Sequence, residues 1–271
     1  MIGGVTRRLG NAFICLRRRT ASEAGILKVV DSHSHLGYCR VFEFDVKEER
    51  LIESMGRNGV DAAIVQPFPG APNAKETHDG IMSLSRKHPG RIFGLVSINP
   101  HQDEEVVVGE IERCVKKLGF VGVKIHTIGH AVNPQGKDAD VLWRTAARLG
   151  VPLMVHTGPG VPLALPSNVM PKAEEYPEVP VILAHAGFGL YSGEAFLVAK
   201  RYENVYLEMS WAPEYDVDSM MRSFPDKVLF GSDLPENTAA ELTKIRSLGF
   251  PEETLSKVLG GNAARLFKLR L

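Results

Sequence analysis

Two histidines separated by one residue, His33 and His35, follow an apolar run at residues 26–30. Alternate side chains of a β-strand point to the same face, so both imidazoles can converge on one divalent ion. Two imidazoles supply only half of a metal site, and solvated histidines at a strand end would show the same spacing. The other metal-capable residues of the chain therefore have to decide between these interpretations.

Four more such residues stand at the ends of apolar runs: His126, His156, His185 and Asp233. Imidazole nitrogens and a carboxylate oxygen suit zinc, or another borderline divalent ion, in a site that keeps one position open for water. A water in that position ionises near neutral pH and becomes a nucleophile. Asp233 could both ligate the metal and accept the proton, and His185, if it is not a ligand, could stabilise or protonate an oxyanion.

The segments that must position these residues alternate between two kinds, strand-like and helix-like. Short, β-rich apolar runs occur at residues 26–30, 60–65, 92–98, 121–125, 151–155, 179–184, 205–207 and 228–230. Segments with helical spacing lie between them, at residues 46–57, 74–87, 104–117, 139–149, 172–176, 192–202, 216–223 and 237–247. Eight such units predict a single (β/α)8 TIM barrel over residues 25–271, with its active site at the carboxyl ends of the strands. The proline-rich loop at 157–171 is the predicted substrate-shaping wall.

Composition excludes several classes of partner. The 271 residues are 44% hydrophobic and 24% charged, with 32 basic residues against 32 acidic ones. A chain without net charge is not a typical nucleic-acid or membrane-surface binder, and three scattered cysteines predict neither a disulfide framework nor a thiolate cluster. We expect a cytoplasmic homodimer that acts on a small molecule. Residues 1–24 are rich in arginine and are expected to be a leader, such as a transit peptide, or a helix across the barrel floor.

Five motifs follow one another in strand order: His33-Ser-His35, Val-His156-Thr-Gly, Leu-Ala-His185-Ala-Gly, Phe-Gly-Ser-Asp233-Leu-Pro and Gly-Asn-Ala-Ala-Arg-Leu-Phe at 261–267. This set resembles the metal-dependent amidohydrolase superfamily over residues 26–269. More narrowly, it is similar to the amidohydrolase-related branch that includes aminocarboxymuconate-semialdehyde decarboxylase, aromatic-acid decarboxylases and lactone hydrolases. The resemblance implies a (β/α)8 barrel and a catalytic or second-metal role for His185. It also implies four metal ligands: His33, His35, His156 and Asp233.

Four residues are predicted to contact the substrate: Lys124, His126, Arg40 and Trp211. Binuclear superfamily members carry a carbamylated lysine on the fourth strand, so Lys124 is either such a bridge between two ions or an ammonium that pairs with an acidic group or the substrate. His126 shares this ambiguity. Arg40 could pair with a carboxylate, and Trp211, with Glu208 at the end of the seventh strand, could form an aromatic wall.

His130 and Ser210 are second-line candidates for the same rim, and three other histidines carry no predicted role. His78, His88 and His101 fall in helical or connecting segments and are expected to be surface residues.

These residues favour a zinc-type hydrolase that opens an amide, lactone or ester bond of a small molecule with a metal-activated water. The alternative is a metal-dependent decarboxylase of an aromatic or unsaturated carboxylic acid, in which Arg40 would hold the substrate. A non-catalytic metal-binding protein is the third hypothesis.

Overall fold

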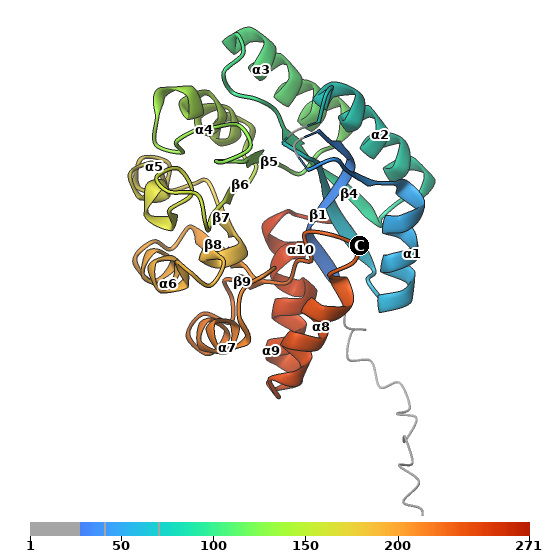
Figure 1. Ribbon diagram of the computed structural model, residues 1–271, viewed down its shortest axis with the longest axis vertical. Helices are drawn as coiled ribbons and strands as arrows, with labels where there is room; N and C mark the ends of the chain where they lie inside the picture. Colours follow the sequence, from blue (N-terminus) through green and yellow to red (C-terminus); the bar gives the residue numbers. More distant parts are fainter. Residues whose placement is uncertain (1–27, 41, 70) are drawn as a thin grey trace, which may run out of the picture.

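The computed structural model describes residues 28–40, 42–69 and 71–271, so the predicted leader at 1–24 lies outside the described residues. Eight parallel strands form the barrel: β1 (Val30–Cys39), β3 (Ala62–Pro67), β4 (Ile92–Ser97), β5 (Gly122–Ile125), β6 (Leu153–His156), β7 (Val181–Ala184), β8 (Val205–Glu208) and β9 (Val228–Leu229). The ring closes where the segment after β9 meets β1. There the amide of Asp233 donates to the carbonyl oxygen of His33 over 2.7 Å. The predicted (β/α)8 barrel is confirmed (Figure 1).

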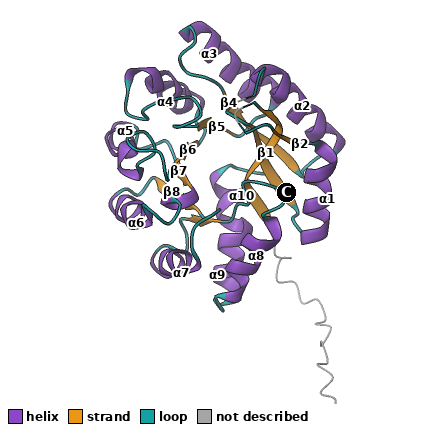
Figure 2. Cartoon of the chain, viewed as in Figure 1, coloured by secondary structure: helices purple, strands orange, loops and turns teal. Residues whose placement is uncertain are grey.

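Helices surround the strands on the outside of this ring (Figure 2). They are α1 (Glu48–Asn58), α2 (Ala74–Lys87), α3 (Glu104–Glu112) with a π-helical turn at Arg113–Lys117, α4 (Lys137–Leu149), α5 (Met170–Glu175), α6 (Ser192–Arg201), α7 (Glu214–Ser223) and α8 (Thr238–Ser247). The chain then ends in α9 (Glu252–Ser256), a π-helical turn at Lys257–Gly261 and α10 (Asn262–Leu266). Within the described part of the chain, no helix combines the length and apolarity needed to cross a bilayer.

The first strand lies later than predicted. Seven of the eight strands begin and end within two residues of the predicted runs, but β1 spans Val30–Cys39 and contains the His-x-His motif. Closure of the barrel explains the difference, because this polar segment pairs with β3 on one side and with residues 230–233 on the other. β1 continues into an antiparallel hairpin with β2 (Phe44–Val46), which the sequence pattern did not predict.

Two apolar clusters hold the barrel together. The larger one lies between the strands and the surrounding helices and includes Val65, Val123 and Leu183. The smaller one combines alternate strand residues such as Ile64 and Leu95 with the end of α10. Because strand side chains alternate between faces, these two sets correspond to the outside and the inside of the barrel. The end of α10 therefore packs against the inner layer, and the polar strand ends stay open on the opposite side.

Candidate active site

β1 brings His33 and His35 to one side of the barrel mouth, where Asp233 joins them. Nε2 of each histidine lies 3.3 Å from Oδ1 of Asp233. A register irregularity in the pairing of β1 with β3, between Asp31 and Ser34, precedes the second histidine. We call His33, His35 and Asp233 the donor cluster.

The partners of the two imidazoles determine which nitrogen carries the proton. Nδ1 of His33 lies 2.7 Å from a Glu208 carboxylate oxygen, and Nδ1 of His35 lies 3.3 Å from the carbonyl oxygen of Pro67. Both partners are acceptors, so each Nδ1 carries the hydrogen and each Nε2 keeps a lone pair. The two lone pairs and the Asp233 oxygen thus face one another, with Lys124 Nζ 3.2 Å from Nε2 of His33 and Gln66 Nε2 3.3 Å from Nε2 of His35. A divalent cation fits this arrangement.

Asp233 is held in a strained backbone conformation by contacts on its other side. Its φ angle is 66° and that of Trp211 is 64°, a region that non-glycine residues rarely adopt. The Trp211 indole N–H donates to Asp233 Oδ2 over 2.8 Å, which leaves Oδ1 to the donor cluster. Gly231 is required nearby, because a Cβ there would lie 2.5 Å from a Glu208 oxygen.

His185 extends the donor cluster through a buried relay. Its Nδ1 lies 2.8 Å from the hydroxyl of Ser210, and that hydroxyl donates to Glu208 over 2.9 Å. Nδ1 of His185 is therefore protonated, and Nε2 is the free acceptor. Burial lowers the pKa of His185 to about 3, so the ring is neutral at pH 7. Ligand atoms of His185, His33 and Asp233 lie within 4.8 Å of one another.

His156 and His126 form a stacked pair beside this relay. Their ring centroids are 4.2 Å apart, and the buried Nδ1 atom of half-buried His156 has no hydrogen-bond partner among the described residues. The amide of Gly129 donates to Nδ1 of His126, so His126 presents an N–H at Nε2 rather than a lone pair. Burial lowers the pKa of both rings well below the usual histidine value. His126 thus suits an oxygen of a substrate better than a metal.

Lys124 lies beneath the donor cluster. It is fully buried, and its Nζ is 3.2 Å from Nε2 of His33. Burial lowers the pKa of Lys124 to about 8, while the carboxylates of Asp233 and Glu208 oppose that change. Lys124 does not line the cavity above, so the structure brings it to the candidate ligands rather than to the space for a substrate.

A cavity of about 470 Å³ opens over the cluster. Its polar lining consists of His35, His126, His156, His185 and Asp233. Its walls are aromatic and aliphatic: Phe42, Phe44, Phe68, Pro69, Ile128, Phe188 and Leu234. The lining includes no residue from the predicted wall at 157–171 and omits both Arg40, which is exposed, and Trp211, which is 41% exposed and stacks on Phe188.

Two further differences separate the site from the prediction. The phenylalanines of the walls were missed, although their clustering after strand ends was a usable signal. The expectation that His78 is a surface residue is wrong, because it is fully buried and its Nδ1 lies 2.8 Å from Glu110. Burial of α2 against β4 accounts for this.

Comparison with known proteins places this geometry in a family. The model of the amidohydrolase family (description "Amidohydrolase") matches residues 52–269. A γ-resorcylate decarboxylase of Polaromonas sp. is 25% identical over 82% of this chain and 87% of its own length; one of Rhodococcus jostii is 24% identical over 82% and 85%.

Solved structures show the same fold at low identity. A 2,6-dihydroxybenzoate decarboxylase from Rhizobium is 20% identical, with a TM-score of 0.72 over 90% of this chain and 99% of that one. A 5-carboxyvanillate decarboxylase from Novosphingobium aromaticivorans, complexed with manganese, is 18% identical with a TM-score of 0.72 over 93% and 98%.

These relatives correct the predicted reaction. The expectation of a hydrolase is wrong, because the curated relatives that match most of the chain are decarboxylases. The resemblance to the superfamily, in contrast, is confirmed. The chain belongs to the amidohydrolase superfamily, in the branch that includes aminocarboxymuconate-semialdehyde decarboxylase, and it is an enzyme of that superfamily.

Proposed function

We propose that the protein is a metal-dependent decarboxylase of a hydroxylated aromatic carboxylic acid. The observation that carries the proposal is the cavity of about 470 Å³, whose phenylalanine walls stand over a floor of histidines and one aspartate. Such walls suit a flat ring, and the polar floor suits its oxygens. The decarboxylases among the relatives support the same reaction class.

The imidazole and carboxylate groups of the donor cluster fit a divalent cation. We propose that His33, His35, His156 and Asp233 hold this cation. When bound, the cation supplies positive charge that orients the substrate oxygens and stabilises negative charge as it develops. Imidazole and carboxylate ligands suit zinc, which we propose as the ion, and also manganese, which one related decarboxylase contains. Elemental analysis of the purified protein distinguishes these ions and counts them.

The residues of the chain can move the proton that the reaction needs. Loss of carbon dioxide breaks a carbon–carbon bond, leaves the electron pair on the ring carbon and requires one proton there. Nε2 of His185 is a free acceptor that can take a proton from the substrate hydroxyl and return it to the ring carbon, after which a proton from solvent restores the hydroxyl of the product. The Ser210–Glu208 relay stabilises the transient imidazolium through Nδ1. The Nε2–H of His126 orients a substrate oxygen, and Asp233 remains our second candidate for proton transfer.

The test is the release of carbon dioxide from 2,6-dihydroxybenzoate and other hydroxybenzoates by the metal-loaded enzyme. We expect equal amounts of carbon dioxide and the decarboxylated phenol. His185→Asn should lower kcat by at least about 100-fold, because it removes a positioned proton-transfer group. His101→Asn changes an exposed histidine and is the matched control. Absence of carbon dioxide release across the panel, or equal losses in both variants, would refute the proposal.

Lys124 decides whether a second ion is present. We propose that it stays an amine, as a neighbour of His33 rather than a carbamate bridge. Lys124→Met should then leave the metal content per chain unchanged. A content that falls by half, together with activation of the metal-depleted enzyme by bicarbonate, would show the bridge instead. We further propose a cytoplasmic homodimer, the dimer being testable by light scattering.

A further inference from the structure

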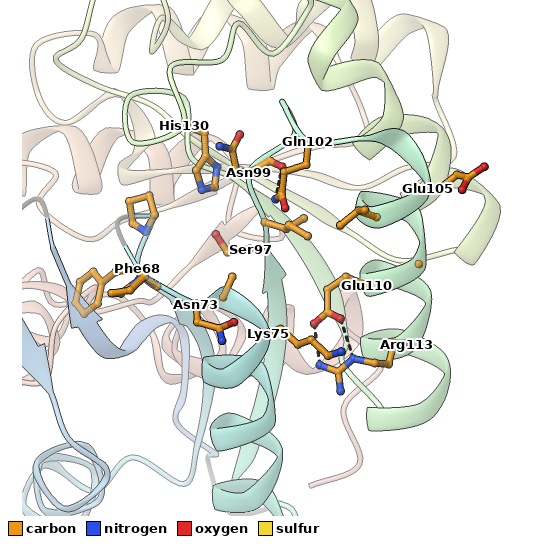
Figure 3. Close-up of a pocket in the computed structure, with 17 residues that line it drawn as sticks. Phe68, Asn73, Lys75, Ser97, Asn99, Gln102, Glu105, Glu110, Arg113 and His130 are labelled. Carbon is orange, nitrogen blue, oxygen red and sulfur yellow. Dashed lines mark hydrogen bonds and ion pairs between the residues drawn. The ribbon is translucent and has the colours of Figure 1, made fainter.

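A second, larger cavity lies on the other side of one active-site wall. It has a volume of about 650 Å³ and opens between α2 and α3, beyond β4 (Figure 3). Among the residues that the structure describes, it shares Phe68 and Pro69 with the cavity over the donor cluster. Amide, hydroxyl and charged side chains line it together with apolar ones such as Phe68, Ile98 and Val106, so it suits a small molecule that carries both polar and apolar groups.

Two buried polar atoms in its lining have no hydrogen-bond partner among the described residues. They are Oγ of Ser97, in a residue only 2% exposed, and Nδ1 of His130, in a residue 8% exposed. Burial lowers the pKa of His130 to about 4, so this ring is neutral at pH 7 and offers a lone pair or an N–H. Figure 3 shows both side chains among the residues that surround the cavity. Buried polar atoms normally have a partner, so a bound molecule with a hydroxyl group would satisfy them.

Some of the charged side chains around the cavity are already paired with one another, and others could still pair with a ligand. Arg113 is already engaged by Glu110 in two hydrogen bonds of 2.8 Å and by Asp79. Lys75 has no carboxylate partner in the part of the chain that the structure describes. The carboxylate of Glu105 is directed away from the cavity, on the outer side of α3 (Figure 3). The accessible charge inside is therefore the positive charge of Lys75.

The amino end of α2 reinforces that positive charge. α2 is fourteen residues long, and Asn73, Ala74 and Lys75 at its beginning line the cavity. The Asn73 side chain accepts from the amide of Glu76, which leaves the amides of Ala74 and Lys75 without a partner among the described residues. Free amides and the helix dipole attract an anion at such an end.

From these contacts we infer that the cavity between α2 and α3 binds a small hydroxylated carboxylic acid. The carboxylate lies at the amino end of α2 beside Lys75, and the hydroxyl group reaches Ser97 and His130. None of the candidate metal ligands lines this space, so the site is separate from the decarboxylation site.

The experiment titrates the full-length, metal-loaded enzyme with 3-hydroxybutyrate in a calorimeter. This probe has few atoms, so a dissociation constant on the order of millimolar is expected. Lys75→Met should weaken binding at least about fivefold and Ser97→Ala about threefold or more, because each removes one hydrogen-bonding group. Lys137→Met is the matched control, since Lys137 is an exposed lysine at the start of α4.

Two results would overturn the inference. One is the absence of binding at about 50 mM probe, more than ten times the expected dissociation constant. The other is a dissociation constant that both cavity variants leave unchanged, with competitive inhibition showing that the probe occupies the active site. Lys75 is exposed, so its variant keeps the test valid if Ser97→Ala fails to fold. The binding measurement needs no turnover and so stands apart from the proposed reaction.

Discussion

Two buried histidine–glutamate pairs of this protein have the same hydrogen bond between Nδ1 of the histidine and the glutamate carboxylate. Nδ1 of His33 lies 2.7 Å from Glu208, and Nδ1 of His78 lies 2.8 Å from Glu110. All four side chains are buried. The first pair supports the donor cluster inside the barrel, whereas the second lies between α2, α3 and β4.

The two pairs differ in the contacts of the second ring nitrogen, Nε2. Nε2 of His78 accepts the amide of Ser97 over 3.1 Å, so both of its nitrogens are used within the fold. Nε2 of His33 instead faces Asp233 and Lys124 at 3.3 and 3.2 Å. Donor atoms of His78, Glu110 and Cys114 also lie within 4.8 Å of one another, yet their hydrogen bonds already satisfy them. Proximity of ligand types therefore predicts a metal site only where the lone pairs face another ligand atom, as Nε2 of His33 faces Asp233.

The largest expected effect comes from removing one histidine of each pair. His33→Ala should reduce the bound metal and lower kcat/KM by more than the roughly 100-fold that follows loss of an outer partner of a metal ligand. His78→Ala should leave the metal content at the wild-type value. Elemental analysis and steady-state kinetics of the two variants check both expectations. A loss of metal in the His78 variant would contradict the view that only the His33 pair supports the metal site.

The next effect concerns the glutamate behind the ligand. Glu208→Gln weakens the acceptor that keeps the proton of His33 on Nδ1, so metal affinity should fall by about 10- to 100-fold. Titration of the metal-free variant with zinc measures this. Glu110→Gln is the matched control, and its metal affinity should equal that of the wild type.

The pair of His78 and Glu110 should contribute to the stability of the fold and not to metal binding. His78→Ala leaves the Ser97 amide and Glu110 with one lost partner each, at a cost of about 1–3 kcal/mol in the free energy of unfolding. Denaturant unfolding, followed by circular dichroism, measures this cost. An unchanged free energy would mean that water replaces the imidazole without loss.

The smallest effect is a pH dependence at Glu110. Hydrogen bonds from Arg113 and His78 outweigh burial and lower the pKa of Glu110 to about 2. A lowered carboxyl pKa stabilises the fold above the ordinary value of 4.5, and this contribution fades as the pH falls towards 2. Between pH 6 and pH 3, wild type should lose on the order of 1 kcal/mol more stability than Glu110→Gln. Parallel losses in both proteins would contradict the assignment.

The sequence pattern predicted the barrel because each strand is a short apolar run between helical segments. It also predicted that the first-strand histidines lie near Asp233, because closure of the barrel makes the first and last strands neighbours. His78 could have been placed correctly, since it shares a helix face with the apolar residues Ile81 and Leu84. The role of Trp211 could not, because the indole reaches Asp233 only through a left-handed turn that no local pattern encodes.

Phe68 has a consequence for anyone who wishes to redesign this enzyme. Its ring stacks on His35 at 4.5 Å and forms part of both cavities. Replacing it with a small residue to admit a bulkier ring would do more than enlarge one space. It would join the two cavities into a continuous passage and admit solvent beside a candidate metal ligand. A change of substrate range at this wall therefore also changes the second cavity and the packing of His35.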